Sequence, residues 1–167
     1  MFQIGDKIVY GSTGVCIVED ITTVNLSGVD KNRLYYVLKP LYQDGIIRTP
    51  VDNEKVFKRP VISRQEAEAL VDMIPTVKAT AYNEKNLGLL RNHYQECLGT
   101  FNCEDLVEMT MSIYAKKQDA ARQQKKFGAT DEKYLKRAEE LLFGELAVAL
   151  EIPREEVQAY ITRRLKK

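Results

Sequence analysis

The side chains best suited to chemistry are few and scattered along this sequence. The only histidine is His93, and the three cysteines are Cys16, Cys97 and Cys103. A zinc site needs about four ligands at close spacing, and a catalytic nucleophile needs a base in contact with it. No such grouping is visible, so we expect no metal, no cofactor, no small-molecule substrate and no enzymatic activity. His93 is expected to be a surface or half-buried helix residue. Cys97 and Cys103 are close enough in sequence to meet across a turn, but buried reduced thiols are favoured, because no CxxC pair is present.

The charge balance limits the partners that the chain can bind by electrostatics. Its 167 residues carry a net charge of only +1, with a sequence pI near 7.6. This argues against a protein that coats nucleic acid by charge alone, so any DNA contact must be local and helped by a partner. No apolar run approaches the roughly 20 residues that cross a bilayer. The opening segment Met1 to Tyr10 carries Asp6 and Lys7 and lacks the layout of a signal peptide, so we expect a cytoplasmic protein without membrane contact.

The predicted secondary structure changes from strands to helices near Pro60. Before it, short segments rich in β-branched and aromatic residues alternate with turns. Four or five such strands in about 60 residues are expected to curl into a small SH3- or Tudor-like β-barrel, because curling hides their edges. The predicted strand cores lie at residues 7–10, 15–18, 34–38 and 45–48, with turns at 11–14, 27–30 and 43–45.

After Pro60 the apolar residues follow a helical period. Ser63 to Glu66 reads as a capping box that opens a helix through Met73. Further helices are expected from about Asn83 or Glu84 to Leu98, from Asn102 as far as Phe127, from Thr130 onward, and after Pro153. The sequence thus predicts an α+β chain with a β domain at residues 1–62 and an all-α domain of about five helices at residues 63–167.

Several of these segments together resemble the CarD/CdnL family of bacterial transcription regulators. The N-terminal part of the pattern is Gly5-Asp6-Lys7-Ile8-Val9-Tyr10, Gly14-Val15, Val18-Glu19-Asp20-Ile21, Tyr36-Val37-Leu38-Lys39 and Arg48-Thr49-Pro50-Val51-Asp52-Asn53; the C-terminal part is residues 137–147. The resemblance covers nearly the whole chain in the right order. It implies a Tudor-like domain that binds the β subunit of RNA polymerase. It also implies a helical domain that contacts promoter DNA, without sequence specificity, at the upstream edge of the bubble and stabilises the open complex.

The resemblance also implies which residues face the polymerase. Arg48 matches an arginine that family members present to it, and Leu26 matches an apolar position of the same interface. Val24 falls where some relatives carry another arginine. A solvated strand arginine is the alternative for Arg48. Docking through an edge strand is a plausible mode, whereas an edge protected by turns and lysines is the commoner arrangement in barrels.

The expected DNA-facing residues lie in the helical half. Asn86-Leu87 aligns with an Asn-Trp pair whose tryptophan acts as a minor-groove wedge, but this sequence has no tryptophan. Leu87 is therefore either a smaller wedge or a core residue of its helix. Arg91, Lys133 and Arg137 are the expected phosphate contacts, since they belong to the resembling segments. The other basic runs, including Lys116 and the tail with Arg164, are expected to be solvated helix faces.

The sequence therefore predicts a non-enzymatic regulator that binds RNA polymerase and touches promoter DNA. Protein contact would supply most of the affinity, and a weak DNA contact at high local concentration would supply the effect. The alternative is a protein-interaction adaptor with a Tudor-like domain and no direct DNA role.

Overall fold

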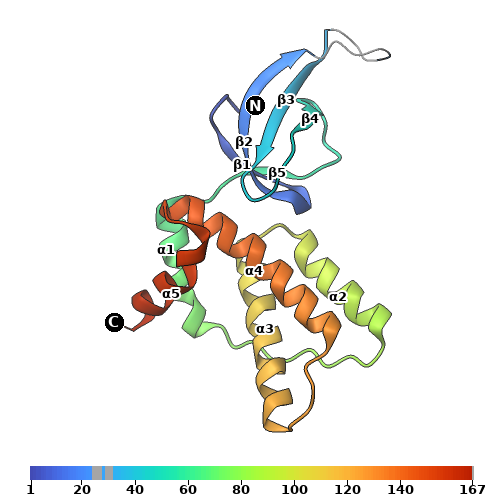
Figure 1. Cartoon of the computed structure of the whole chain (residues 1–167), viewed down its shortest axis with the longest axis vertical. Helices are drawn as coiled ribbons and strands as arrows, with labels where there is room; N and C mark the ends of the chain where they lie inside the picture. Colours follow the sequence, from blue (N-terminus) through green and yellow to red (C-terminus); the bar gives the residue numbers. More distant parts are fainter. Residues whose placement is uncertain (24–27, 29–31, 167) are drawn as a thin grey trace. The chain divides into compact units, whose positions relative to one another are not determined.

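The computed structural model describes residues 1–23, 28 and 32–166. The chain divides into two compact units, Met1–Val61 and Ile62–Lys167. The first unit holds strands and the second holds helices, which confirms the α+β class (Figure 1). The division lies one residue from the boundary drawn on the sequence.

The N-terminal unit is a five-stranded antiparallel sheet in the order β4-β3-β2-β1-β5. Its elements are β1 (Lys7–Tyr10), the short 3-10 turn η1 (Gly11–Thr13), β2 (Gly14–Thr23), β3 (Leu34–Pro40), β4 (Ile47–Pro50) and β5 (Lys58–Pro60). The strands β4 and β5 stand at the two ends of this order and do not pair with each other in the described residues. The sheet is thus open, and closure into a barrel is not confirmed.

The alternation of side chains along the strands builds a small core on one face of the sheet. Ile8 on β1 lies opposite Cys16 on β2, and Val18 lies opposite Leu38 on β3. The buried members of this core are Ile8, Cys16, Val18, Tyr36 and Leu38. Burial raises the pKa of the Cys16 thiol to about 11, so this thiol is protonated and inert at neutral pH.

The C-terminal unit contains five α-helices and two 3-10 turns. They are α1 (Arg64–Met73), η2 (Ile74–Thr76), α2 (Leu87–Gly99), α3 (Cys103–Arg122), α4 (Ala129–Leu150), η3 (Arg154–Glu156) and α5 (Val157–Leu165). The predicted capping box is present: the Ser63 hydroxyl accepts from the Glu66 backbone N–H at 3.1 Å, and the Glu66 carboxylate accepts from the Ser63 N–H at 3.0 Å. The helix it opens runs through Met73 as expected.

The remaining helix ends differ from the prediction by a few residues. The second helix begins at Leu87 and not at Asn83 or Glu84, because Asn86 caps it by accepting from the Leu89 N–H at 3.1 Å. The third helix ends at Arg122, before Gln124 adopts a left-handed φ of 54°. The last α-helix starts only at Val157, after a 3-10 turn that follows Pro153.

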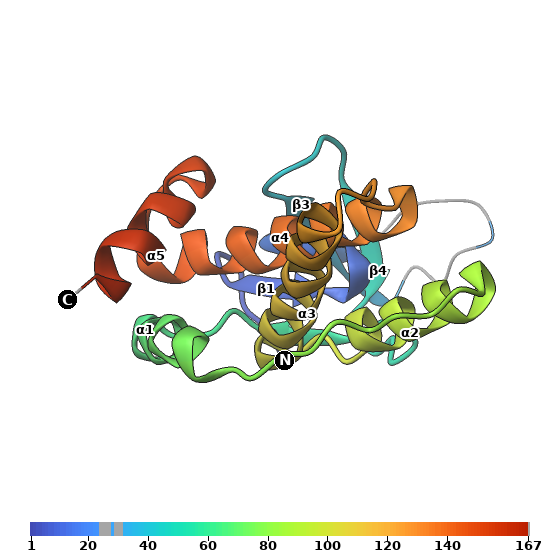
Figure 2. The same ribbon diagram turned by 90° about the horizontal axis from the view of Figure 1, so that it is seen from below.

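The long helix α4 organises the helical unit. Helices α1 and α5 pack on each other and on one end of α4, whereas α2 and α3 pack on each other and on its other part (Figures 1 and 2). The core between them includes Ile113, Leu146, Leu150 and Val157, all exposed by 1% or less.

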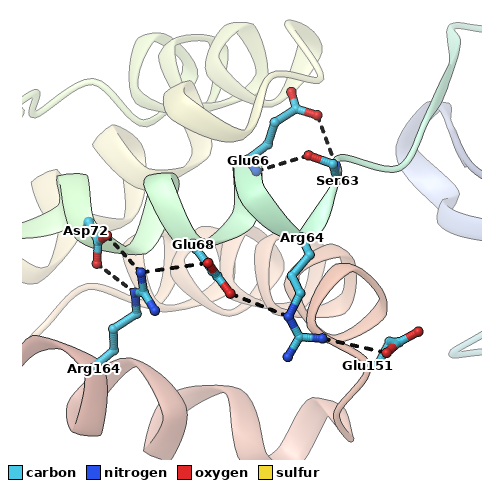
Figure 3. A network of polar contacts seen from close by, with 7 residues as sticks. All are labelled: Ser63, Arg64, Glu66, Glu68, Asp72, Glu151 and Arg164. Carbon is cyan, nitrogen blue, oxygen red and sulfur yellow. Dashed lines mark hydrogen bonds and ion pairs between the residues drawn. The ribbon is translucent and has the colours of Figure 1, made fainter.

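A network of charged side chains joins α1 to α5 (Figure 3). The Arg164 guanidinium donates to both carboxylate oxygens of Asp72, at 2.7 and 3.0 Å. Arg64 lies 3.4 Å from Glu68 and 3.6 Å from Glu151. The pattern of basic residues had suggested a solvated tail, but Arg164 is held in a bidentate ion pair and is therefore not free for phosphate contact.

Asp72→Asn is expected to weaken the helical unit at neutral pH but not in strong acid. The hydrogen bond from Arg164 lowers the pKa of the Asp72 carboxyl below its usual value. A carboxyl with a lowered folded-state pKa stabilises the fold above its unfolded pKa, near 3.9, and this contribution disappears as pH falls through the lower folded value. Urea unfolding followed from pH 7 to pH 2 should show the difference between the two proteins shrink at low pH. A constant difference would contradict the role assigned to this ion pair.

Candidate functional site

The outer edge of β4 presents Arg48 to solvent. Along this strand Thr49 is buried and Ile47 packs against the core, so Arg48 between them points outward. Val37 of β3 is its partner across the ladder, and no further strand pairs with β4 among the described residues. Among the residues that the structure describes, none forms an ion pair with Arg48. An exposed arginine on a sheet edge can make bidentate contacts with a partner's carboxylates.

Apolar side chains surround the same strand end, and sequence reasoning missed them. Ile46, two residues before Arg48, is 48% exposed, and Leu41 and Tyr42 on the β3–β4 connection are 37% and 38% exposed. Exposed aromatic and aliphatic groups beside an arginine are typical of a protein interface. Ile46 lies in the predicted strand at residues 45–48, and Leu41 and Tyr42 precede the predicted turn at 43–45, so only their exposure in the structure identifies them. Leu26, the other polymerase-facing residue predicted from the sequence, lies outside the described residues.

The N-terminus of α2 presents a second cluster of exposed residues. Asn86 is its N-cap, and its side chain is bound to the helix backbone. Leu87 is 55% exposed and Leu89 is 53% exposed, whereas Leu90 is buried at 3%. The core alternative for Leu87 is therefore wrong, because Leu90 fills that role. The wedge alternative stays a prediction, and Leu89 is an additional exposed apolar residue that the sequence pattern did not single out.

The three expected phosphate contacts lie on two helices that touch each other. Arg91 is exposed on α2, and Lys133 is exposed on α4 with its Nζ 5.8 Å from the Tyr134 ring centroid. Arg137 on α4 is half-buried and lies 3.5 Å from Glu140. The helices α2 and α4 are joined by a hydrogen bond of 3.2 Å from the Gln95 amide to the Tyr134 hydroxyl. The structure thus places these basic groups on neighbouring helices, with part of the charge of Arg137 neutralised.

Lys116, which the sequence placed in a solvated basic run, instead forms a buried ion pair. Lys116 of α3 lies 3.0 Å from Asp131 of α4, and both side chains are largely buried, at 18% and 7% exposure. The Tyr94 hydroxyl of α2 donates to the same Asp131 oxygen at 2.6 Å. Burial, followed by this hydrogen bond, raises the pKa of Tyr94, so the hydroxyl remains a donor at any physiological pH. Lys116 is therefore a structural residue and not a phosphate contact.

His93 and Cys97 line a hollow of about 830 Å³ between α2, α3 and residues 76–82. The His93 ring stacks on Tyr82 with centroids 3.7 Å apart. Burial raises the pKa of the Cys97 thiol, and the nearby carboxylates of Asp105 and Glu96 raise it further. A thiol with a raised pKa is a poor nucleophile at neutral pH. Neither Cys97 nor Cys103 forms a disulfide, and Cys103 is buried as the sequence favoured, whereas Cys97 is only half-buried.

Two findings bear on membranes and metals. Across the residues that the structure describes, none of the helices combines the length and apolar character needed to cross a bilayer. The same residues include no cluster of three or more histidine, cysteine or carboxylate side chains able to hold a metal ion.

Residues 2–63 match the family model of the CarD-like/TRCF RID domain. The matched segment covers the whole five-stranded sheet and ends at the N-cap of α1. The N-terminal unit is thus a CarD-like/TRCF RID domain, which confirms the resemblance for the N-terminal part of the predicted pattern. This match supports a role in transcription, with RNA polymerase as the partner.

Proposed function

We propose that this chain is a non-enzymatic, cytoplasmic transcription regulator that binds the RNA polymerase β subunit and stabilises the open promoter complex. The N-terminal sheet docks on the polymerase through the edge of β4, with Arg48 as its charged anchor. The family match of residues 2–63 is the observation that carries this proposal. The exposed Ile46 beside Arg48 supports the position of the interface, because it supplies apolar area for a partner to cover.

The N-terminal turn of α2 contacts promoter DNA at the upstream edge of the bubble. Its exposed Leu87 is an apolar wedge, and Arg91, Lys133 and Arg137 contact phosphates. Leucine inserts at the minor groove in several architectural proteins, so the missing tryptophan does not exclude this mode. Contact with phosphates carries no sequence information, and the affinity it adds falls with salt. Binding to the polymerase keeps this surface near DNA, which explains how a chain of net charge +1 acts there.

Arg48→Glu is expected to weaken polymerase binding while leaving the melting temperature unchanged. Reversing a charge at an interface anchor costs about 2–5 kcal/mol of binding, whereas an exposed strand position contributes little to stability. Lys7→Glu, at an exposed position on β1, which β2 and β3 separate from β4, is the matched control and should bind normally. Titration of both variants with the β subunit, beside thermal melts, tests the interface. Equal affinity of Arg48→Glu and the parent protein would identify Arg48 as a solvated strand residue.

A protein-interaction adaptor without a DNA role is the second candidate. The pairing of Lys116 with Asp131 and of Arg164 with Asp72 favours it, because both pairs remove positive charge from the helical unit. The two candidates differ in one observable. A regulator that touches DNA lengthens the lifetime of the open complex, and an adaptor leaves that lifetime unchanged while still binding polymerase.

A further inference from the structure

Helix α2, which carries the proposed DNA-contacting turn, is held to the rest of the helical unit by little buried surface. Of its 13 residues only Leu90 and Tyr94 are buried. By contrast, α3 buries six residues and α4 buries ten. The orientation of α2 about its own axis therefore depends on a small number of contacts near its middle.

The strongest of these contacts is polar and converges on Asp131. Asp131 is 5% exposed and lies in the first turn of α4. One of its carboxylate oxygens accepts from the Tyr94 hydroxyl at 2.6 Å and from the Lys116 ammonium at 3.0 Å. One side chain thus joins α2, α3 and α4. A buried carboxylate is tolerated only when it is paired and hydrogen-bonded, and both conditions are met here.

The start of α4 is built to accommodate this carboxylate. The N-cap of α4 is Gly128, which offers no side-chain cap. A Cβ on Gly128 would come within 3.0 Å of the second oxygen of Asp131, so the missing side chain leaves room for the carboxylate. A negative charge in the first turn also interacts favourably with the helix dipole. The ion pair to Lys116 and the helix dipole hold Asp131 in place independently of Tyr94, so α2 is attached to a rigid point.

We propose that Asp131 is the positioning residue of the DNA-contacting turn. Through the Tyr94 hydroxyl it fixes the rotation of α2, and this rotation determines where Leu87 and Arg91 point. Leu87 lies two helical turns before Tyr94 on the same helix, so any change in the roll of α2 at Tyr94 moves Leu87 as well. This inference rests on the proposed DNA contact of α2, but the attachment of α2 can be tested separately.

The chain contains a matched control for this hydrogen bond. The Tyr114 hydroxyl donates to Glu139 at 2.9 Å, which joins α3 to α4 without involving α2. Burial and then the bond to Glu139 raise the pKa of Tyr114 to about 12, so it too remains a donor. Tyr94→Phe and Tyr114→Phe each remove one hydroxyl from a bond between a tyrosine and a carboxylate of α4. They differ in whether α2 is attached by that bond.

The test combines hydrogen exchange with promoter-opening kinetics on the full chain bound to RNA polymerase. For Tyr94→Phe we expect faster amide exchange in α2 and an open-complex lifetime shortened about threefold or more, with polymerase affinity unchanged. Tyr114→Phe should leave both the exchange of α2 and the lifetime unchanged. In a double-mutant cycle, the effects of Tyr94→Phe and Asp131→Ala on the lifetime should be less than additive, because each change removes the bond between Tyr94 and Asp131.

Three outcomes would overturn the inference. The first is unchanged exchange of α2 in Tyr94→Phe, which would show that the bond does not hold the helix. The second is an equal loss of lifetime in Tyr94→Phe and Tyr114→Phe, which would show a general effect of stability. The third is additivity in the cycle. If Leu87→Ala leaves the lifetime unchanged, the proposed DNA contact fails, while the exchange data still report whether Asp131 holds α2.

Discussion

Leu87→Trp is expected to lengthen the lifetime of the open promoter complex, and Leu87→Ala is expected to shorten it. The Leu87 side chain is 55% exposed at the first position of α2. A larger flat group covers more of an unstacked base, and stacking of a base on an aromatic side chain contributes about 1–3 kcal/mol. That energy corresponds to a change in lifetime of roughly five- to 150-fold. Neither variant should lower the melting temperature appreciably, because the position is not part of the core.

Leu90→Ala is the matched control for the change at Leu87. Leu90 lies on the same helix but is only 3% exposed, so its truncation should cost about 2–5 kcal/mol of stability. Thermal melts separate the two positions, and promoter-opening kinetics at a temperature where all variants are folded then reports the DNA contact. Lifetimes that do not respond to either Leu87 variant would exclude the wedge. DNA contact would then depend on Arg91, Lys133 and Arg137, with a steep salt dependence as its signature.

Leu38→Ala and Ile113→Ala are expected to destabilise different units of the chain. Leu38 belongs to the core of the sheet and Ile113 to the core of the helices, and both side chains are 0% exposed. Each truncation should lower the free energy of unfolding of its own unit by about 2–5 kcal/mol. Hydrogen exchange resolved by residue should show lost protection in strands β1–β4 for Leu38→Ala and in α2–α5 for Ile113→Ala. Loss of protection in both units for either change would contradict the assignment of separate cores.

The elements that were predicted best are those with a local physical signal. Ser63 and Glu66 form a capping box that depends only on spacing, and the helix it starts ends where Pro75 prevents its continuation. Lys7–Tyr10 is a strand with the same bounds in the sequence and in the structure. The start of α2 was misplaced because Asn83 and Asn86 are both possible caps, and only the structure shows which side chain meets the helix backbone.

The features that could not be predicted depend on contacts between distant residues. β5 consists of three residues, one of them Pro60, and its pairing with β1 is what makes it a strand. Nothing in the sequence around Lys116 distinguishes it from its exposed neighbour Lys117. Only the fold brings Asp131 beside Lys116, so the pattern of charges in the sequence could not predict this ion pair.

The candidate site residues show the same contrast between what the sequence indicates and what only the fold shows. The sequence left two roles open for Leu87, a DNA wedge or a core residue. The helical pattern alone does not show which leucine of the helix points into the core. The structure excludes the core alternative, because Leu90 is buried and Leu87 is exposed, and the wedge stays a prediction. Arg48 was found through its family position, whereas the exposed Ile46 beside it carries no family signal and was found only from its accessibility.

The central claim is that the N-terminal sheet docks the chain on RNA polymerase, and one binding measurement tests it most directly. Residues 1–61 and residues 62–167 are each titrated with the polymerase β subunit, after circular dichroism has shown that each is folded, and compared with the full chain. Residues 1–61 are expected to bind with a Kd within a few-fold of that of the full chain, and residues 62–167 are expected to show no binding. Binding by the folded helical unit, with none by the folded sheet unit, would contradict it.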